Sequence, residues 1–402
     1  MNHKIDTGDH QPIRQPMRRY PYNHLKAIDQ HLNDMPRQGI IEPATSPWAS
    51  NVVLAKKKDG TLRCCIDFRQ LNDITRKDAY PLPRRDACLD AMSGSHLFST
   101  FDMRSSYHQL PMHPESSDKT AFITRRGAFR YKTMPFGLCN ARATFQRLMD
   151  LVLTGLNLEI CLVYLDDIVV FGTTPEEHLE RLTKVLERLR QANLKLKPSK
   201  CKLMQKQVVF LGHIVSGQGI ATDPVKTRLV QEWPVPTNLK QVRGYLGLTS
   251  YYRRFVQDYA KIAAPLNKLT RKNQPYVWTE ACQEAFDELK KRLTSPPILA
   301  MPNEEGPFIL DCDACETLIG AVLSQIQGGQ ERVIAYAGRV LSRSELNYCD
   351  EERVVSSGIF RPVLQTISAR KTVHHTYGSF CFVLVEEDAR NNRSKCPLVR
   401  NT

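Results

Sequence analysis

The stretch CLVYLDDIVVF, residues 161–171, decides the fold and carries the most informative chemistry in this chain. Apolar residues precede and follow Asp166-Asp167, which predicts a buried strand, a tight turn and a second buried strand. Two adjacent carboxylates inside such an apolar hairpin cost on the order of several kcal/mol unless a cation compensates them. Aspartate is also common in solvent-facing turns, so the pair by itself is equally compatible with an ordinary turn.

A third carboxylate stands in a similar position elsewhere in the chain. Asp102 directly follows residues 96–101, which read as another strand. Two or three converging carboxylates are enough to hold two Mg²⁺ ions (Mn²⁺ is an alternative), because substrate phosphates and waters complete the coordination. The set Asp102, Asp166 and Asp167 therefore predicts a two-metal site suited to nucleotidyl transfer.

Composition narrows the class of protein. The 402 residues suggest two or three domains, and the net charge of +14 favours polyanionic partners, nucleic acid first, although solubility explains the charge equally well. No apolar run approaches the ~18 residues of a membrane span, and the start lacks a secretory signal. We expect a cytoplasmic protein, with a virus-like particle or the nucleus as alternatives. Its twelve cysteines would be reduced, and the Cys312–Cys315 C-x-x-C spacing is only weak evidence for zinc or redox chemistry.

Periodicity and capping residues predict the main elements. We expect helices over 25–38, 142–153, 174–193 (capped by Thr174) and 280–293 (capped by Thr279), a hairpin over 50–68, and strands over 308–312, 319–325 and 333–336. The third helix carries an apolar stripe that we expect to pack in the core: Leu179, Leu182, Val185, Leu186 and Leu189. Residues 239–273 mix tyrosine with arginine, which indicates either helix core or a nucleic-acid surface. Beyond Cys349 the periodicity stops.

Five ordered motifs resemble one family, the gypsy-like long-terminal-repeat retrotransposons. YLDD at 164–167 resembles the YxDD box of reverse transcriptases, and FSTFDMRSSYHQ at 98–109 resembles the preceding catalytic motif. MPFGLCNA at 134–141, FLGH at 210–213 and KKKDGTLRCCIDFRQLN at 56–72 resemble the MPFGLxNAP box, the primer grip and the fingers hairpin. The matches cover roughly residues 1–350, and five matches in order are far more specific than any one.

The resemblance implies an α+β architecture: a right-hand polymerase fold of fingers, palm and thumb, then a connection segment and an incomplete ribonuclease H-like mixed sheet. Its domain boundaries would be an extended N-terminal segment over 1–24, fingers and palm over 25–215, and a thumb or connection segment over 216–275. The first part of a ribonuclease H-like domain would occupy 276–349, and an aberrant tail, frameshifted or disordered, 350–402.

The resemblance also implies roles for individual residues. Asp102 and Asp166 would be the main metal ligands and Asp167 the third carboxylate. Lys57 and Arg63 would contact the incoming triphosphate, although the neighbouring lysines of the hairpin tip are simply solvated.

The remaining roles concern the nucleotide and the primer. Tyr107 would be the steric gate that excludes a ribose 2′-hydroxyl; without the resemblance it would be read as a core tyrosine. Gly137 would let the backbone approach the nucleotide, and Gln146 would lie near the template or on the helix surface. The predicted primer grip is Phe210, Leu211, Gly212 and His213.

Several positions depart from the family pattern. Asp313 stands at the first ribonuclease H carboxylate, but the family's glutamate position is Val354, with Glu351 and Glu352 out of place. We therefore expect no ribonuclease H activity, and we interpret the tail as translation in a shifted reading frame. Ser106 replaces a glycine whose backbone shape a serine could resist, and Arg142 replaces a proline.

The sequence thus predicts an RNA-directed DNA polymerase that takes an RNA template, a DNA primer and dNTPs. The alternative is a catalytically decayed remnant that only binds nucleic acid. The oligomeric state stays open.

Overall fold

The computed structural model describes residues 1–56, 62–303, 306–314, 318–342, 371–375 and 381–386. The chain forms two compact units, the first made of residues 1–84 and 97–205, the second of residues 85–96 and 206–402. In the described part of the chain, no helix has both the length and the apolar character needed to cross a membrane.

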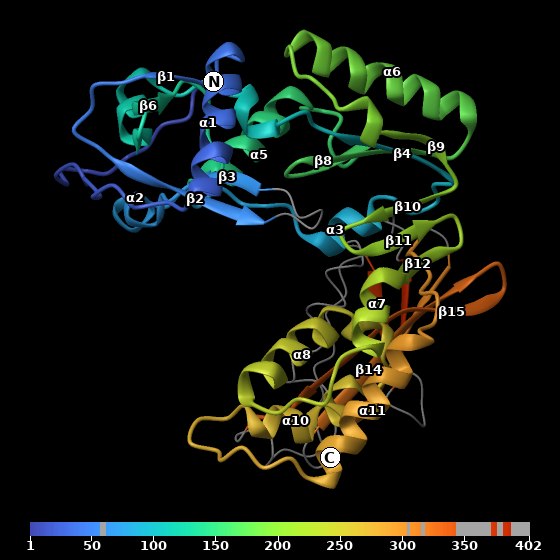
Figure 1. Ribbon diagram of the computed structural model, residues 1–402. Helices are drawn as coiled ribbons and strands as arrows, with labels where there is room; N and C mark the ends of the chain where they lie inside the picture. Colours follow the sequence, from blue (N-terminus) through green and yellow to red (C-terminus); the bar gives the residue numbers. More distant parts are fainter. Residues whose placement is uncertain (57–61, 304–305, 315–317, 343–370, 376–380, 387–402) are drawn as a thin grey trace. The chain divides into compact units, whose positions relative to one another are not determined.

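The first unit holds two sheets, with strand orders β1-β6-β5-β2-β3 and β7-β8-β4-β9 (Figure 1). The strands are β1 Ile41–Pro43, β2 Ser50–Lys56, β3 Leu62–Ile66, β4 Leu97–Asp102, β5 Phe122–Thr124, β6 Gly127–Tyr131, β7 Cys161–Tyr164, β8 Asp167–Gly172 and β9 Lys202–Gln205. The helices are α1 Tyr22–Arg37, α2 Arg69–Ile74, α4 Pro114–Ser117, α5 Ala141–Val152 and α6 Pro175–Gln191, with short 3₁₀ turns η1 Ser106–Gln109, η2 Asp118–Thr120 and η3 Pro198–Lys200. The helices and hairpin expected in this unit are confirmed to within a few residues.

The sheet β7-β8-β4-β9 carries the acidic residues. The predicted hairpin over 161–171 is confirmed as β7 and β8, joined by a turn of only two residues, Leu165 and Asp166. Helix α6 packs on β8 and β4, and α5 packs on β7. The central strands β8 and β4 are therefore largely buried, and β8 reads as a nearly continuous apolar run.

Helix α6 starts and ends where its sequence signals predict, but its buried face differs. The Thr174 hydroxyl accepts a hydrogen bond from the Glu177 amide, which caps the first turn. The buried side chains are those of His178, Leu182, Val185 and Leu189. Leu179 and Leu186 are 55% and 40% exposed, so including them in the core stripe was wrong. Each is one position, about 100°, round the helix from the buried face.

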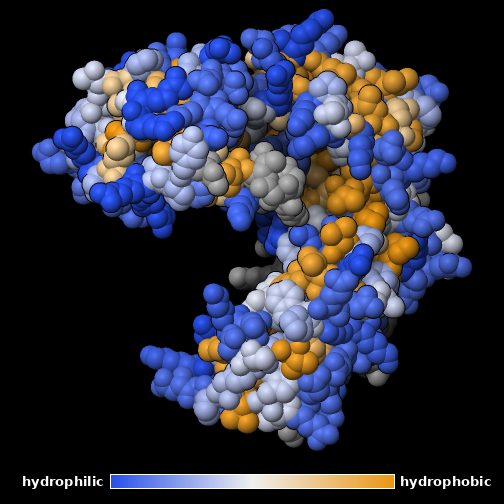
Figure 2. Space-filling model, viewed as in Figure 1, coloured by the Kyte–Doolittle hydropathy of each residue, from blue (hydrophilic) through white to orange (hydrophobic). Residues whose placement is uncertain are grey.

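The surface over α6 is mixed in hydropathy. Figure 2 shows apolar side chains among hydrophilic ones over α6 on the viewed face. Scattered apolar residues of this kind are normal on a protein surface.

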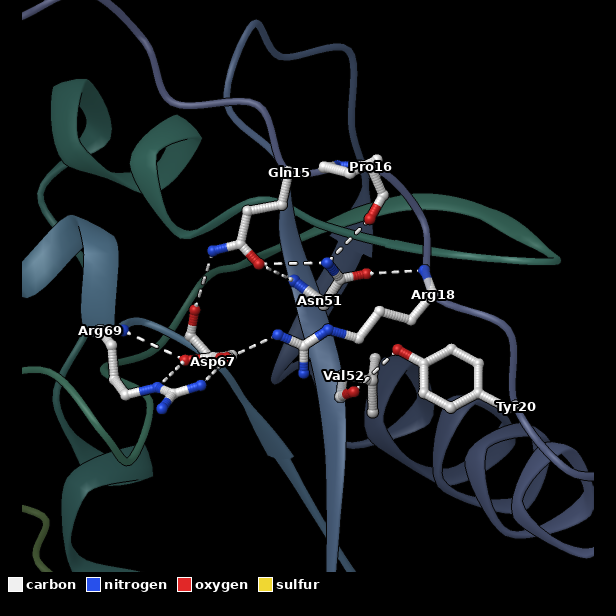
Figure 3. A network of polar contacts seen from close by, with 8 residues as sticks. All are labelled: Gln15, Pro16, Arg18, Tyr20, Asn51, Val52, Asp67 and Arg69. Atoms are coloured by element: carbon white, nitrogen blue, oxygen red, sulfur yellow. Dashed lines mark hydrogen bonds and ion pairs between the residues drawn. The ribbon is translucent and has the colours of Figure 1, made fainter.

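A polar network attaches the extended N-terminal segment to the β2–β3 hairpin (Figure 3). The Asn51 side-chain amide donates to Gln15 Oε1 (3.1 Å) and to the Pro16 carbonyl (2.9 Å). The nearly buried carboxylate of Asp67, just after β3, accepts two hydrogen bonds of 2.8 Å from the Arg69 guanidinium and one of 3.2 Å from Arg18. These bonds hold the pKa of Asp67 at about 2, chiefly through Arg69.

The second unit contains the sheets β10-β11-β12 and β15-β14-β13-β17-β16. Its strands are β10 Gln207–Phe210, β11 His213–Ser216, β12 Gly219–Thr222, β13 Phe308–Ala314, β14 Leu318–Gln327, β15 Gln330–Val340, β16 Lys371–His375 and β17 Cys381–Glu386. Its helices are α3 Arg85–Asp90, α7 Pro224–Gln231, α8 Leu239–Tyr251, α9 Tyr259–Ile262, α10 Ala264–Leu269 and α11 Glu280–Thr294, with η4 Arg253–Phe255.

The aromatic residues of 239–273 and the C-terminal tail both contribute to the second unit. Tyr245, Tyr252 and Phe255 are buried, so most of the aromatic residues of segment 239–273 are core. No regular structure was expected after residue 350, yet β17 pairs with β13, opposite Phe308 to Asp311. β16 pairs in turn with β17, and residues 350–370, 376–380 and 387–402 of the predicted tail lie outside the described residues.

We expect Asp67→Asn to lower the free energy of unfolding at pH 7 by about 1–2 kcal/mol, because charged hydrogen bonds are lost but both arginines are partly solvated. The folded-state pKa lies below the ordinary value of 3.8. The stabilisation is therefore complete above that value and is lost as the pH falls toward 2. Denaturant unfolding of wild type and variant between pH 7 and pH 2.5 measures the difference. A difference that stays constant over this range would contradict the assignment, and Asp34→Asn, on the exposed side of α1, is the control.

Candidate active site

The β4–β8 register brings the three predicted carboxylates together. Asp102, the last residue of β4, pairs directly with Asp167, the first residue of β8. Side chains directly opposite on antiparallel strands have Cβ atoms about 5 Å apart. Asp166 precedes Asp167 in the two-residue turn. The carboxylates thus gather at one end of two buried strands, although they lie 64 residues apart in the sequence, from 102 to 166.

The electrostatics of this cluster favour a cation. Burial raises the pKa of Asp166, as does the nearby Asp102, whereas the Ser106 hydroxyl and the positive charge of Arg142 lower it. The pKa of Asp167 is also raised, first by desolvation and then by the charges of Asp166 and Asp102. The Asp167 side chain reaches solvent. Asp166 Oδ1 is buried without a hydrogen-bond partner in the protein.

One cation already approaches the cluster. Lys200, in η3, places its Nζ 2.9 Å from Asp102 Oδ2. Within the described ranges, no three Asp, Glu, His or Cys side chains converge closely enough to enclose a metal ion. An ion bound here would need ligands from elsewhere, as Mg²⁺ in phosphoryl-transfer sites does from water and substrate phosphates.

Two adjoining pockets share Asp166 and Phe136. The first, of about 660 Å³, is lined by Asp102, Met103, Arg104, Ser105, Ser106, Phe136, Asp166, Leu196, Lys197, Pro198 and Lys200. The second, of about 500 Å³, is lined by Tyr107, Phe136, Gly137, Leu138, Cys139, Ala141, Arg142 and Asp166. The predicted gate Tyr107 and Gly137 therefore stand in one pocket with a predicted metal ligand.

Comparisons with known proteins identify the family. The family model "Reverse transcriptase (RNA-dependent DNA polymerase)" matches residues 55–215, and "RNase H-like domain found in reverse transcriptase" matches 278–360. The Pol polyprotein of transposon 297 from Drosophila melanogaster is 38% identical over 382 residues, which are 93% of this chain and 35% of the relative. The Pol polyprotein of transposon gypsy from the same fly is 35% identical over 371 residues, 87% of this chain and 35% of the relative. The chain belongs to the reverse transcriptases of long-terminal-repeat retrotransposon Pol polyproteins.

The chain spans about a third of the length of those relatives. Its fold resembles the foamy viral protease-reverse transcriptase, solved in complex with an RNA/DNA hybrid, with a TM-score of 0.76 and 24% identity over 91% of this chain and 49% of that one. At this identity the likeness shows the fold, a mixed α/β reverse transcriptase followed by an RNase H-like domain. The match to the RNase H-like model extends eleven residues beyond Cys349, where the motif resemblance stops.

Gln146 does not lie on the helix surface, which was one of the two expectations for it. Its side chain, on α5, is fully buried. Its Oε1 accepts the Leu165 amide (2.8 Å), and its Nε2 donates to the Val163 carbonyl (3.2 Å) and to Asp150 (3.0 Å). Leu165 has φ +57°, a left-handed conformation that costs a leucine about 1–2 kcal/mol. Gln146 therefore holds the strained turn that carries Asp166.

Sequence reasoning missed two other residues that support the site. Asn157 Oδ1 accepts the Val163 amide at 3.2 Å, and its Nδ2 donates to Asp150 at 3.1 Å, which extends the Gln146 network. Asn72 donates to the Gly137 carbonyl and accepts the Cys139 amide, both at 2.8 Å, so it holds the loop beside Tyr107. The only signal in the sequence for Asn72 is its position at the end of the motif at 56–72.

The predicted gate Tyr107 and the departure at Ser106 fit the backbone of this loop. Tyr107 is buried, with its ring centroid 4.9 Å from that of Phe136. Gly137 has φ +95°, which explains why glycine is needed there. The left-handed residue of this loop is Ser105 (φ 49°) rather than Ser106, so the expected backbone conflict at Ser106 is wrong. The Ser106 hydroxyl instead lowers the pKa of the neighbouring Asp166 carboxyl.

The predicted phosphate-binding and primer-grip residues lie in different parts of the structure. Lys57 lies outside the described residues, and Arg63 pairs with Ala55 on the β2–β3 hairpin. Phe210 and His213 are buried in the second unit, whereas Leu211 and Gly212 form the turn between β10 and β11. Burial lowers the pKa of His213 to about 4, so it is neutral at pH 7.

The ribonuclease H residue Asp313 lies on β13, exposed and opposite Gly320. It shares a pocket of about 190 Å³ with Asp311 and Asp258. Glu351, Glu352 and Val354 lie outside the described residues. Cys312 is buried and Cys315 is also outside them, so a zinc or redox role stays untested.

We expect Gln146→Leu to loosen the carboxylate turn, because it leaves the Leu165 amide and the Val163 carbonyl unpaired. Amide hydrogen exchange over 161–171 should quicken by roughly tenfold or more, as a loss of about 1–3 kcal/mol implies. Gln205→Leu, which removes a glutamine bond to a backbone carbonyl on the exposed edge strand β9, is the matched control. Equal exchange in the two variants would contradict this role for Gln146.

Proposed function

We propose that this chain is an RNA-directed DNA polymerase that transfers deoxynucleotides onto a primer 3′-hydroxyl. The observation that carries the proposal is the cross-strand pairing of Asp102 with Asp167 beside the turn residue Asp166. Its partners would be an RNA template, a DNA primer and dNTPs, consistent with its family and with the RNA/DNA hybrid bound by the foamy viral relative.

The donor set fits Mg²⁺. Asp102, Asp166 and Asp167 supply hard carboxylate oxygens, and Asp166 Oδ1 is a buried acceptor that the protein leaves unpaired. Bound there, two ions would activate the primer 3′-oxygen and stabilise the leaving pyrophosphate. Lys200 would have to release Asp102 Oδ2 for the full set of carboxylate oxygens to become available.

The protein's own residues would do the positioning. Tyr107, fixed by Phe136 and Phe145, would lie against the sugar and exclude a 2′-hydroxyl. The left-handed Gly137 would let the pocket wall approach the nucleotide. Arg63 and Lys57 would contact the triphosphate, and residues 210–213 the primer.

A second proposal concerns the RNase H-like domain. We infer that it does not cleave RNA, because Val354 occupies the position of the family's glutamate and a two-metal nuclease needs several carboxylates. The interpretation of the tail as a frameshift product remains a prediction, as do the domain boundaries and the cytoplasmic location.

We expect Asp166→Asn to lower primer extension on an RNA template with Mg²⁺ by at least about 100-fold, roughly 2.7 kcal/mol in the barrier. Duplex binding should persist, because it rests on basic side chains elsewhere. Primer extension and salt-dependent binding measure the two effects, with the exposed Asp34→Asn as control. Template binding without extension by the wild type would support a decayed remnant instead.

The RNase H proposal predicts that an RNA/DNA hybrid labelled on its RNA strand stays intact during extension with Mg²⁺ or Mn²⁺. Cleavage by the wild type that is retained in Asp166→Asn but lost in Asp313→Asn would show an active second site.

A further inference from the structure

The turn at Leu211-Gly212 has a demanding backbone. It joins β10 to β11 with Phe210 opposite His213, so the loop holds only two residues. Both are left-handed, with φ 48° at Leu211 and 70° at Gly212. Two-residue hairpin turns with both φ values positive favour Asn-Gly or Gly-Gly, and glycine suits the second position. Leucine at the first position is strained, so contacts from elsewhere must stabilise this shape.

Two consecutive tyrosines supply those contacts. The Tyr251 hydroxyl donates a short hydrogen bond to the Leu211 carbonyl, and the Tyr252 hydroxyl donates to the Gly212 carbonyl at 2.6 Å. A Cβ on Gly212 would lie 3.4 Å from the Tyr252 hydroxyl and 3.6 Å from the Tyr251 ring, so both side chains lie directly against the turn. Both carbonyls of the turn are thus held by the end of α8.

Aromatic packing fixes the tyrosines themselves. The Tyr251 ring lies nearly parallel to that of His213, with centroids 5.4 Å apart, and the Arg85 guanidinium lies 4.6 Å from its centroid. Tyr252 is buried and meets His213 edge-on at 5.4 Å. The hydroxyls therefore have little freedom to follow the turn if it moves.

The two bonds also determine where the turn's amides point. The peptide between Leu211 and Gly212 is trans, so its carbonyl and its N–H point in opposite directions. With the Leu211 carbonyl held by Tyr251, the Gly212 N–H faces away from the tyrosines. A backbone N–H in a left-handed turn is a donor suited to an anion such as a phosphate.

We propose that Tyr251 and Tyr252 are positioning residues that hold the 210–213 turn so that the Gly212 N–H is presented to a phosphate of the primer strand. The proposal rests on the proposed polymerase function and assigns the contact to the backbone of the turn. Phe210 and His213, whose side chains are buried, then support the turn from within.

The test uses Tyr251→Phe, Tyr252→Phe and the double variant, which keep the rings and remove only the hydroxyls. The matched control is Tyr245→Phe, because Tyr245 lies on the same helix, is buried, and donates the same kind of bond to the Phe286 carbonyl at 3.0 Å. The full chain is assayed with a primer–template duplex at fixed salt, by anisotropy for duplex affinity and by extension for the KM of dNTP. Melting temperatures of all variants are compared.

Each single variant should weaken duplex affinity about threefold to tenfold, the effect of one hydrogen bond, and the double variant more. The KM of dNTP at saturating duplex should stay within about twofold of wild type, because the affected turn lies outside the nucleotide pocket. Tyr245→Phe should lower the melting temperature as much and leave duplex affinity unchanged.

Three outcomes separate this inference from the polymerase proposal. If the wild type extends primers and the turn variants bind duplex like Tyr245→Phe, the positioning role is wrong and the polymerase proposal stands. If the wild type binds duplex without extending it, the polymerase proposal fails. The positioning role is then decided by whether the turn variants bind duplex more weakly than Tyr245→Phe does. If the wild type does not bind duplex, both are wrong.

Discussion

The pairing of β4 with β8 is the constraint on which the site depends. Its register sets Asp102 opposite Asp167, and a shift of one residue would turn every buried side chain of either strand to the other face. The apolar residues of the two strands therefore maintain the position of the carboxylates as well as the core. Packing of α6 over both strands makes that register hard to change.

Two strained turns in this chain are stabilised by side chains that are distant in the sequence. Leu165 and Leu211 are both leucines with left-handed backbone, each in a two-residue hairpin turn. In each case side chains from a helix bond to the backbone of the turn: Gln146 at Leu165, Tyr251 and Tyr252 at Leu211 and Gly212. Non-glycine residues keep such conformations only where the surrounding structure over-determines them, and such positions concentrate at functional sites.

Helix and strand positions were largely predictable because capping and periodicity are local properties. Thr174 and Thr279 cap their helices as expected, and the hairpin over 161–171 formed. The errors arose where the burial of a side chain depends on how its helix packs against the rest of the structure. Leu179 and Leu186 have the right residue type for a core, yet the angle at which α6 packs on its sheet buries His178 instead.

By itself, the sequence determined the family, the order of the elements and the three candidate carboxylates, because each of these follows from motifs that are contiguous in the chain. Only the tertiary structure decided that Gln146 supports the carboxylate turn, that Lys200 meets Asp102, and that two tyrosines hold the turn at 211–212. Each of these contacts joins residues between 19 and 98 positions apart. A hydrogen bond depends on direction and distance in space, and no local pattern in a chain specifies those for partners so far apart.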